Sequence, residues 1–596
     1  MLRTHNSFEL NARLAGQRVT VAGWVDRRRD HGGLIFIDVR DRAGLVQVVF
    51  NPEVAADCHK IAEDLRGEFV IQVTGTVSMR PDGTHNPKLA TGEIEILADT
   101  LNVLNTSETP PFYVNEDVEV DENLRLRYLY LNMRRPRVRD IILLRHQVMR
   151  FMRSYFDGLS FVEVETPILG KSTPEGARDY LVPSRVHQGK FYALPQSPQQ
   201  MKQLLMVGGI ERYYQIAKCF RDEDTRADRQ PEFTQLDVEM SFIEEEDIMS
   251  IAEEMFIGLV RSLCPSKQMT IPFPRIRYAD AMEYYGSDKP DLRFDMRISD
   301  VSQVVAESEF GVFKNTVAAG GKVKAIALPG CGAYSRQELA HLTELAQGYG
   351  ARGLLSLSIG ECGSIDALTM EDVKSVAAKY LTLEQIKQIA VCTGAKPGDL
   401  VVFVADSDAV AANTLGRLRQ EMGLRLKLAD PEQFAFAWIT DFPLLEWNKD
   451  FNRWQATHHP FTSPLEEDIP FLDSDPSKAG SRAYDIVLNG HEIGGGSIRI
   501  HQAWLQRKIF HVMGYTDTEI DERFGHLLEA FSYGAPPHGG IAVGVDRLVM
   551  LLSNAGNIRD VIPFPKNQNA VDMLFNAPAP ATPEQLNEVH ILLRDE

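Results

Sequence analysis

The chain has 596 residues, a formal net charge of −20, and ordinary proportions of hydrophobic and charged residues, 44% and 24%. This length predicts three or four domains at roughly 100–200 residues each, and the composition excludes a mainly disordered chain. No apolar stretch approaches the ~20 residues that cross a bilayer, and the N-terminus lacks the apolar core of a secretory signal. We therefore expect a cytoplasmic protein without a membrane partner.

Cysteine spacing and the excess of acidic residues narrow the choice of partners. The six cysteines lie far apart without a C-x-x-C pair, which favours reduced thiols over disulfides or a zinc site. An acidic chain is a poor partner for polyanions, because phosphate binding is dominated by Lys and Arg. Arginines nevertheless cluster at 27–29 and at 134–139, where a solvated surface and a nucleic-acid site both stay open.

The N-terminal part of the chain predicts a small β-barrel. Apolar segments alternate with turn residues there, and five closely spaced strands are typical of a closed barrel of the OB type. The expected strands are 17–25, 33–41, 44–51, 68–79 and 92–104. We assign 1–108 to this barrel and 109–140 to a linker or hinge, because 105–121 is polar and contains adjacent prolines.

The remainder of the chain predicts a mainly antiparallel domain with an insertion. An amphipathic helix is expected at 140–157, and strand patterns follow it before and after the insertion. Within the insertion, predicted strands alternate with helical patterns at 336–347 and 370–380, which indicates an αβ domain. The expected boundaries are 141–294 and 426–562 for the larger domain, 295–425 for the inserted domain, and 563–596 for a C-terminal extension.

The first segment with chemical content is a predicted hairpin at 212–242. Alternation places Gln235, Asp237 and Glu239 on one face of its second strand, opposite an apolar face. Arg221 follows the first strand, and the loop after it carries further arginines. An edge hairpin with a solvated polar face stays open as an alternative. The arginines favour an anion site, since guanidinium groups match phosphate oxygens.

The second segment, 483–501, predicts a hairpin around an Asn-Gly turn. That register sets Val487 opposite Glu492 and places Asp485 diagonal to Glu492. Two converging carboxylates could hold one Mg²⁺, which prefers oxygen ligands. An exposed pair on a solvated strand is the alternative. The glycines at 494–496 favour the metal site, because bare backbone in a strand often marks the close approach of a ligand.

The third segment, 539–552, predicts a short strand that ends at Gly544 and a helix that begins near Asp546. Arg547 then lies in the first helical turn, where backbone N–H groups and the helix dipole favour an anion. A purely structural arginine is the alternative. The sequence contains neither a P-loop nor a Rossmann glycine pattern, so a nucleotide would be bound in another way.

These segments, in this order, resemble the three signature motifs of class II aminoacyl-tRNA synthetases. The helix at 140–157 followed by FVEVETPIL resembles motif one, CFRDE…RQPEFTQLDVEM resembles motif two, and GVDRLVMLL resembles motif three. The strings TPEGARDYLVP, LPQSPQQMKQLLM and HHPFTSP narrow the resemblance to bacterial-type aspartyl-tRNA synthetases. The implied fold is a multidomain α+β protein with an N-terminal OB-fold barrel, a class II antiparallel-sheet catalytic domain and an inserted αβ domain. Motif one implies a homodimer.

The resemblance implies ATP-dependent attachment of L-aspartate to tRNA through an aspartyl-adenylate, with Mg²⁺ as cofactor. Catalytic roles fall on Arg221, Arg547 and Glu492. Asp485 and Glu492 are the implied Mg²⁺ ligands. The implied ATP-binding residues are Arg221, Asp222, Glu223, Gln230, Glu492, Gly544, Val545, Asp546 and Arg547.

The resemblance also implies how aspartate is recognised. Lys202 and Arg499 take its β-carboxylate, whereas Glu175, Gln199 and Asp237 lie near its ammonium group. Asparagine would leave buried cations facing a neutral partner, which argues against the asparaginyl- and lysyl-specific relatives. The implied aspartate-binding residues are Glu175, Gln199, Lys202, Arg221, Asp237, His458 and Arg499, with Gln196 and Ser197 lining the pocket.

The barrel is expected to bind the anticodon of tRNA(Asp), and we expect no DNA partner. Its implied contacts are Arg28, Arg29, Phe36 and Gln47, with Phe36 as a stacking platform for a base. His31 and Gly83 resemble the residues of non-discriminating members, which also aspartylate tRNA(Asn). A loop cap for His31 and a turn glycine at position 83 are the structural alternatives.

Three other functions stay open: an enzyme restricted to tRNA(Asp), a catalytically inactive OB-fold RNA-binding paralogue, and an ATP-dependent aspartate ligase without tRNA. Retention of Arg221, Asp485, Glu492 and Arg547 counts against the inactive paralogue. The N-terminal barrel counts against a ligase without tRNA. The inserted domain shows no motif that indicates a site.

Overall fold

The computed structural model describes residues 1–172 and 176–594. The described residues form two compact units, one of residues 1–143 with 559–580 and one within residues 144–558 with 581–594. No helix in the described ranges is both long and apolar enough to span a membrane. All six cysteines are free in the structure.

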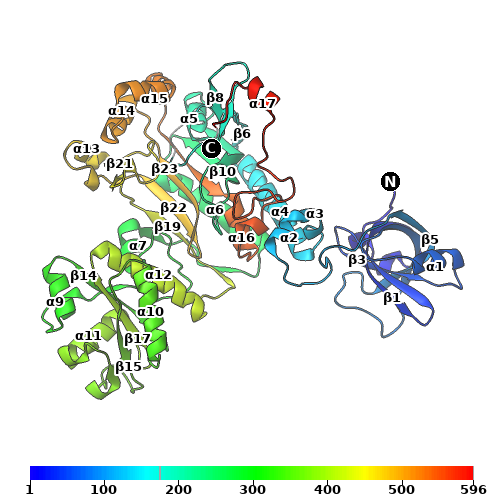
Figure 1. Ribbon diagram of the computed structural model, residues 1–596, viewed down its shortest axis with the longest axis horizontal. Helices are drawn as coiled ribbons and strands as arrows, with labels where there is room; N and C mark the ends of the chain where they lie inside the picture. The colour runs from blue at the N-terminus through cyan, green and yellow to red at the C-terminus, as the bar shows by residue number, and fades with distance from the viewer. Residues whose placement is uncertain (173–175, 595–596) are drawn as a thin grey trace. The chain divides into compact units, whose positions relative to one another are not determined.

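The N-terminal strands form a closed five-stranded barrel in the order β1-β2-β3-β5-β4, which confirms the OB-type prediction (Figure 1). Alternate residues such as Val19, Val21, Ile35 and Ile37 fill its core. The strands are β1 (Arg18–His31), β2 (Leu34–Arg40), β3 (Leu45–Phe50), β4 (Val70–Met79) and β5 (Ile94–Asn105).

Strand β1 is longer than predicted, because it continues beyond residue 25 to His31. Its first half pairs with β4 and its second half with β2, and the register shifts between Val25 and Arg27. Alternation of burial stops after this bulge, which explains why the pattern of apolar residues did not reveal the strand. The arginine cluster at 27–29 therefore lies on a strand, with Arg29 opposite Phe36.

Three short helices complete the first unit. Helix α2 is tied to the C-terminal part of this unit by ion pairs from Glu122 to Arg559, at 2.7 Å, and from Arg125 to Asp560, at 3.1 Å. The segment 106–121 contains no helix or strand, as its polar composition indicated. The helices are α1 (Ala56–Glu63), α2 (Glu122–Arg127) and α3 (Leu129–Asn132).

An eight-stranded, mainly antiparallel sheet forms the centre of the second unit, in the order β12-β19-β22-β23-β24-β10-β9-β6. Strand β10 lies between β24 and β9, so the edge-hairpin alternative is wrong. The strands are β6 (Val162–Glu163), β9 (Arg212–Phe220), β10 (Glu232–Ser241), β12 (Arg275–Arg277), β19 (Phe436–Thr440), β22 (Ala483–Leu488), β23 (His491–Ile498) and β24 (His538–Gly544).

Helices α4 and α6 cover the apolar face of this sheet. Phe156 of α4 stacks on Tyr214 of β9, and Tyr155 of α4 donates a hydrogen bond to the carbonyl of Ile251 in α6. Helix α4 begins at Pro136 rather than at 140, because proline is well suited to the first turn of a helix. The helices around the sheet are α4 (Pro136–Gly158), α5 (Gln199–Val207), α6 (Glu245–Leu263), α7 (Tyr278–Tyr285), α14 (Ala503–Val512), α15 (Asp517–Ser532) and α16 (Val545–Leu552).

The inserted segment contains a five-stranded sheet with helices on both faces. Figure 1 shows its sheet between two groups of helices, and separate apolar cores lie on the two faces, one under α8, α9 and α11 and one under α10 and α12. Its strands are β13 (Ser299–Asp300), β14 (Lys322–Leu328), β15 (Leu355–Ile359), β16 (Val373–Lys374) and β17 (Leu400–Asp406). Its helices are α8 (Ser302–Val305), α9 (Gly311–Ala318), α10 (Arg336–Gly348), α11 (Leu383–Thr393) and α12 (Asp408–Arg425).

The prediction of a helix at 370–380 is wrong. This segment contains the short strand β16 between two single 3₁₀ turns, and Val373 pairs with Ile359 of β15. Valines at 373 and 376 favour extended backbone, and pairing with the sheet edge outweighs the local helical pattern. The remaining short elements are β7 (Leu181–Pro183), β8 (Phe191–Ala193), β11 (Gln268–Met269), β18 (Gln433–Phe434), β20 (Leu445–Asn448), β21 (Arg453–Ala456), α13 (Phe471–Ser474) and α17 (Pro583–Glu588).

Candidate functional site

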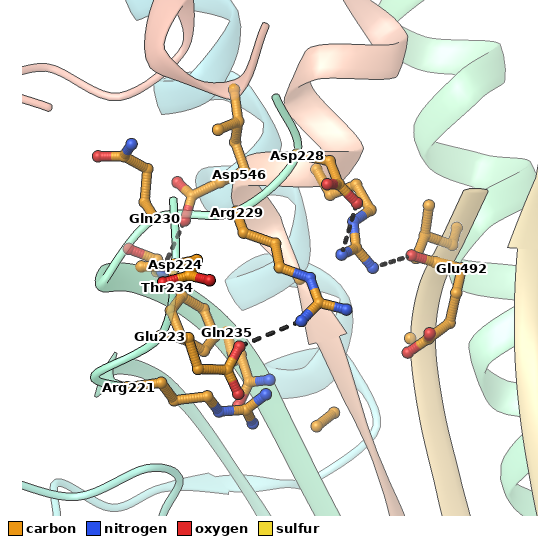
Figure 2. Close-up of a pocket in the computed structure, with 17 residues that line it drawn as sticks. Arg221, Glu223, Asp224, Asp228, Arg229, Gln230, Thr234, Gln235, Glu492 and Asp546 are labelled. Atoms are coloured by element: carbon orange, nitrogen blue, oxygen red, sulfur yellow. Dashed lines mark hydrogen bonds and ion pairs between the residues drawn. The ribbon is translucent and has the colours of Figure 1, made fainter. Parts of the chain in front are cut away.

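A polar cavity of about 210 Å³ lies over the polar face of the eight-stranded sheet, and we call it the nucleotide cavity. Figure 2 shows Arg221 and Glu492 on facing sides of it, while Arg229 reaches toward Glu223. Arg221 follows β9, Glu492 belongs to β23, and Arg547 lies in the first turn of α16. The three predicted segments therefore converge on one cavity.

The floor beside this cavity is built from small residues. One row across the sheet pairs Asp485 with Gly495, Gly495 with Ala542, and Ala542 with Asp237. A Cβ atom on Gly495 would lie 2.4 Å from Oδ1 of Asp485, so a side chain at position 495 would displace this carboxylate. The residues between Asp485 and Asp237 in this row, Gly495 and Ala542, therefore carry no side chain larger than a methyl group.

Two arginines in the nucleotide cavity have donor groups that the protein does not use. The Nε atoms of Arg221 and Arg547 lack hydrogen-bond partners within the part of the chain that the structure describes. The guanidinium group of Arg221 lies over the ring of Phe233 at 5.1 Å, and Arg547 donates to the carbonyl of Glu492 and to Asp228, at 3.3 Å from the latter. These groups are oriented and still have hydrogen-bonding capacity for an anion.

A closed network of four charged groups lies further along β10. Lys202 Nζ is 3.2 Å from Asp237 Oδ1 and 3.3 Å from Glu239 Oε2, while Arg499 Nε donates to Glu239 Oε1 at 2.9 Å. All four side chains are buried. A Cβ atom on Gly540 would lie 2.1 Å from Glu239 Oε2, so the neighbouring strand leaves space for this carboxylate. We call these residues the buried charge network.

The two carboxylates of the buried charge network differ in character. Burial raises the pKa of Asp237, although Lys202 opposes this. Burial acts on Glu239 as well, but Arg499 and Lys202 outweigh it and lower the pKa of Glu239 to about 2. Asp237 Oδ2 is buried and has no hydrogen-bond partner among the described residues. Glu239 is therefore satisfied by the protein, whereas Asp237 retains an acceptor for a cationic group of a ligand.

Asp485 and Glu492 both lie on the β22–β23 hairpin, and Val487 lies opposite Glu492 as predicted. A β-bulge between Ile486 and Val487 then shifts the register, so Asp485 pairs with Gly495 and not with Gly494, and the predicted diagonal placement relative to Glu492 is wrong by one residue. Burial and the Asp485 carboxylate both raise the pKa of Glu492. His458 Nε2 is 3.1 Å from Asp485 Oδ1, and this contact raises the pKa of His458 although burial opposes it. Two close carboxylates repel each other, and a divalent cation would relieve that repulsion.

The carboxylates of Asp485 and Glu492 suit a hard cation that takes its remaining ligands from water and from a substrate. Among the described residues, no group of three or more His, Cys, Asp or Glu side chains could hold a metal ion. Mg²⁺ is commonly bound by one or two carboxylates together with waters and phosphate oxygens. The arrangement can therefore hold a metal–polyphosphate complex between Glu492 and the two arginines.

Comparisons with known proteins agree with this geometry. A family model described as tRNA synthetases class II (D, K and N) matches residues 121–568, and one described as an OB-fold nucleic acid binding domain matches residues 19–104. The chain belongs to the class II tRNA synthetases of this group.

Individual relatives of this class II chain span its whole length. It is 57% identical to a protein of Dehalococcoides mccartyi named aspartate–tRNA(Asp/Asn) ligase, over 100% of both chains. It is 52% identical to one of Staphylococcus carnosus named aspartate–tRNA ligase, over 98% of this chain and 97% of that protein. The fold is similar to a crystal structure of asparaginyl-tRNA synthetase from Pyrococcus horikoshii complexed with asparaginyl-adenylate, with a TM-score of 0.59 and 19% identity over 95% and 98% of the chains.

Most of the predicted ATP-binding residues of this synthetase line the nucleotide cavity. Asp222 and Val545 are not among the described residues that line it. Asp546 lines it, but Arg145 binds one of its oxygens and the N–H of Thr234 donates to the other at 2.7 Å. The lining residues that were predicted are Arg221, Glu223, Gln230, Glu492, Gly544, Asp546 and Arg547.

Most of the predicted aspartate-binding residues lie around the buried charge network and the floor, whereas Arg221 lines the nucleotide cavity. Glu175 lies outside the described residues. Gln199 is buried and donates to Gln203 at 3.3 Å, and Gln196 donates to Asp179 at 2.5 Å. The amide groups are thus held by protein partners, and the charged groups dominate the pocket.

Three of the four predicted anticodon contacts, Arg29, Phe36 and Gln47, lie on one face of the barrel. Arg29 donates to Asp38 at 2.8 Å and to Gln47 at 3.3 Å, and Gln47 donates to Glu95 at 2.9 Å. Phe36 is partly buried opposite Arg29. Arg28 pairs with Asp30, at 2.8 Å, rather than with this face.

The two residues predicted for tRNA discrimination lie in turns. His31 is exposed at the end of β1 and pairs with Leu34 across a turn. Gly83 follows β4 with φ at 78° and open space around it. That backbone conformation favours glycine, so the structural alternative for Gly83 has a physical basis.

Two residues of the pocket were not assigned from the sequence. The sequence predicts that Glu239 lies on the polar face of its strand but indicates no role for it. It indicates His458 as a substrate contact and not the adjacent His459. Burial and Arg499 hold the pKa of His459 well below its ordinary value, so its Nε2 accepts a hydrogen bond from Arg499 at 2.6 Å. Alternation along β10 was the signal for Glu239, while no sequence pattern marked His459.

Proposed function

We propose that this chain attaches L-aspartate to tRNA(Asp) and tRNA(Asn) in an ATP-dependent reaction, through an aspartyl-adenylate. The observation that carries the proposal is the buried charge network, which has a charge balance suited to aspartate. Full-length relatives at 51–57% identity, named aspartate–tRNA(Asp/Asn) ligase, support the same activity.

The charge balance explains the choice of amino acid. If Asp237 offsets the substrate ammonium group, Glu239 offsets one of the two cations Lys202 and Arg499, and one positive charge is left for a β-carboxylate. Asp237 has an acceptor oxygen left for the substrate ammonium group. Asparagine would leave the second cation buried without an opposite charge, which costs several kcal/mol, about three or more. Gln199 and His458 complete this pocket.

The first step is transfer of the adenylyl group. An oxygen of the aspartate α-carboxylate forms a bond to the α-phosphorus of ATP while the bond from that phosphorus to the bridging oxygen breaks. Pyrophosphate leaves with the electron pair. Arg221 stabilises the charge on the α-phosphate and Arg547 binds the outer phosphates, which is the positioning and charge stabilisation that such transfers need. Glu223 and Gln230 contact the adenosine part.

The hairpin carboxylates are proposed to hold Mg²⁺. Asp485 and Glu492 supply two oxygen ligands. Burial and, after it, the neighbouring Asp485 carboxylate raise the pKa of Glu492, and a bound cation would offset both effects. When bound, Mg²⁺ supplies positive charge that neutralises the phosphate oxygens.

In the second step the terminal adenosine hydroxyl of tRNA attacks the aspartyl carbonyl, and AMP leaves. The barrel binds the anticodon through Phe36, Gln47, Arg28 and Arg29. His31 and Gly83 relax the choice between two anticodons that differ at one base, since an imidazole both donates and accepts hydrogen bonds. We further propose a homodimer formed through motif one. Exposed apolar side chains at Val162, Ile168 and Leu169 support that surface.

The test is ATP–pyrophosphate exchange with each amino acid, followed by aspartylation of purified tRNA(Asp) and tRNA(Asn). We expect exchange with aspartate alone and charging of both RNAs. Absence of exchange in folded protein would support the inactive RNA-binding paralogue, and exchange without charging would support a ligase that does not use tRNA. A thousandfold preference for tRNA(Asp) would contradict dual specificity. With both charged, His31→Leu is expected to lower the rate for tRNA(Asn) more than for tRNA(Asp).

A further inference from the structure

A second cavity, of about 430 Å³, adjoins the nucleotide cavity and is lined in part by the inserted domain. The two cavities share the residues Asp228, Arg229, Glu492 and Arg547. On its other side the second cavity is lined by the loop after α7, which carries Lys289, and by Arg417 and Gln420 of α12. We call it the outer cavity.

The strand register places the outer cavity in line with the reaction. On β10 the order along the strand is Glu239, Asp237 and Gln235, and the last of these pairs with Gly544 at the end of β24. Glu492 and the turn residue Gly490 lie at this same end of the sheet, because β23 runs antiparallel to β24. The buried charge network, the nucleotide cavity and the outer cavity therefore follow one another along the strands.

This order matters because attacking and leaving oxygens lie roughly in line in phosphoryl and nucleotidyl transfer. Aspartate, bound at the network, attacks from the side of Asp237. The leaving group then departs on the opposite side, toward Glu492, Arg547 and the outer cavity.

Two cationic residues, Lys289 and Arg417, line the outer cavity and do not line the nucleotide cavity. Lys289 is partly exposed, and its ion pair is a long one of 3.9 Å with the adjacent Asp288. Arg417 is exposed and lies over the ring of Tyr349 at 5.4 Å, with no ion pair to any described carboxylate.

The junction between α7 and α12 fixes these two cations. Gly286 and Gly416 meet so closely that a Cβ atom on Gly286 would lie 2.0 Å from the Ala412 carbonyl oxygen, and one on Gly416 would lie 2.7 Å from the Gly286 carbonyl oxygen. Arg417 follows one of these glycines directly, and Lys289 lies three residues after the other.

Arg419 holds the loop from the opposite side. Its side chain is buried, and its guanidinium group donates to the backbone carbonyls of Asp291, Phe294, Asp295 and Met296 at 2.7 to 3.1 Å. A loop this firmly held by α12 presents Lys289 in a defined position.

We propose that the outer cavity binds pyrophosphate as it leaves the nucleotide cavity, with Lys289 and Arg417 as its binding residues. The inserted domain thereby contributes to the first step through Arg417. This inference rests on the proposed function, because pyrophosphate arises only if the chain forms an adenylate.

The experiment measures pyrophosphate use by the enzyme-bound adenylate. Full-length protein is loaded with aspartate and MgATP in the presence of pyrophosphatase and separated from small molecules. It is then mixed with Mg-pyrophosphate, and ATP formation is followed in a single turnover at increasing pyrophosphate concentration. The variants are Arg417→Gln and Lys289→Gln, with Arg417→Lys as a charge-retaining variant. Arg425→Gln is the control on the same helix, since Arg425 pairs with Glu421 at 2.8 Å and is outside the residues that line either cavity.

We expect Arg417→Gln and Lys289→Gln each to raise the pyrophosphate concentration for half-maximal rate by roughly three- to tenfold, the effect of one charge-assisted contact in a hydrated cavity. The ATP concentration for half-maximal adenylate formation should change less than twofold. Arg417→Lys and Arg425→Gln should resemble the unsubstituted protein.

Three results would overturn the inference. One is an unchanged pyrophosphate dependence in both glutamine variants. Another is an equal rise in the ATP requirement, which would make these residues part of the ATP site. The last is a loss confined to tRNA charging, which would assign the cavity to RNA. Failure of the unsubstituted protein to form adenylate at all is a different outcome, and it would count against the proposed function.

Discussion

The buried charge network and the nucleotide cavity differ in how their charged side chains are paired. In the buried charge network, Lys202 and Arg499 are 0% and 2% exposed, and each has a carboxylate partner within 3.3 Å. In the nucleotide cavity, Arg229 and Arg547 remain 49% and 22% exposed, and Nε of Arg221 and of Arg547 lacks a partner among the described residues. A network of paired, buried charges can discriminate between small amino acids by their charge. Arginines with unused hydrogen-bond donors are suited to a polyanion that binds and then dissociates.

This difference separates stability from activity. Removing one member of a closed network leaves its partner charged and buried, which is costly. Removing an arginine with unused donors leaves the protein intact and removes only what it does for the ligand. Substitutions in the buried charge network should therefore change stability and activity together, whereas those in the nucleotide cavity should change activity alone.

The largest expected effect is that of Arg499→Leu. It would leave Glu239 with Lys202 alone, and breaking a buried pair costs about 3–5 kcal/mol. We expect a clear loss in the free energy of unfolding, measured by urea denaturation, and a weakening of aspartate binding far greater than that of ATP. Arg482→Leu is the control, because Arg482 pairs with Glu244 and Glu245 at the protein surface. Equal weakening of both substrates would mean that Arg499 supports only the fold.

Arg221→Ala is expected to lower activity strongly and to leave stability unchanged. Loss of one charge-assisted contact to the reacting phosphate typically lowers the rate by about 10² or more. The urea midpoint should stay unchanged, since the protein leaves Nε of Arg221 without a hydrogen-bond partner. Exchange of pyrophosphate into ATP and urea denaturation are measured together, with Arg212→Ala as the control for a lost arginine at the other end of β9. A lowered midpoint would contradict the separation.

The neighbours Asp237 and Glu239 are expected to differ in the sign of their pH effects. Because the pKa of Glu239 is lowered from 4.5 to about 2, its contribution to stability is complete above pH 4.5 and is lost as the pH falls toward 2. Glu239→Gln should therefore lower the free energy of unfolding at neutral pH, and the difference from the unsubstituted protein should shrink in acid.

Burial raises the pKa of Asp237, so its ionised form costs stability once the pH exceeds the unfolded value of 3.8. Because Lys202 keeps Glu239 as a partner, Asp237→Asn should lower the free energy of unfolding at neutral pH less than Glu239→Gln does, while it abolishes aspartate-dependent exchange. Urea denaturation between pH 3 and pH 7 checks both variants. A loss of stability in Asp237→Asn as large as that in Glu239→Gln would contradict the assignment of Asp237 to the ligand.

The smallest effect is expected in the barrel, where Phe36 is open to stacking but makes no charged contact. Phe36→Ala should raise the tRNA concentration for half-maximal charging by about tenfold, because stacking on one base contributes about 1–3 kcal/mol. Exchange without tRNA should be unaffected. Phe8→Ala, at an exposed aromatic residue of the same unit, is the control. An equal effect of both substitutions would remove the stacking role of Phe36.

Local sequence patterns were sufficient for much of the fold and part of the pocket. Period-two alternation identified β9 and β10 and placed Asp237 with Glu239, because side chains of a strand must alternate between its faces. The Asn-Gly turn fixed the register of Val487 and Glu492, since few turns accommodate two residues with positive φ. Where the pattern was weak, at the bulge in β1 and at 370–380, the predictions were wrong in extent or in kind.

Tertiary structure alone decided how the charges are paired. The sequence contains Lys202, Glu239 and Arg499 far apart, and nothing local indicates that Glu239 binds both cations before aspartate arrives. In the same way, Lys289 and Arg417 belong to segments without any motif, and they line one cavity only because Gly286 and Gly416 bring α7 and α12 into contact. The physical reason is that alternation and turns are set by neighbouring residues, whereas the partner of a buried charge is set by which distant segments exclude water together.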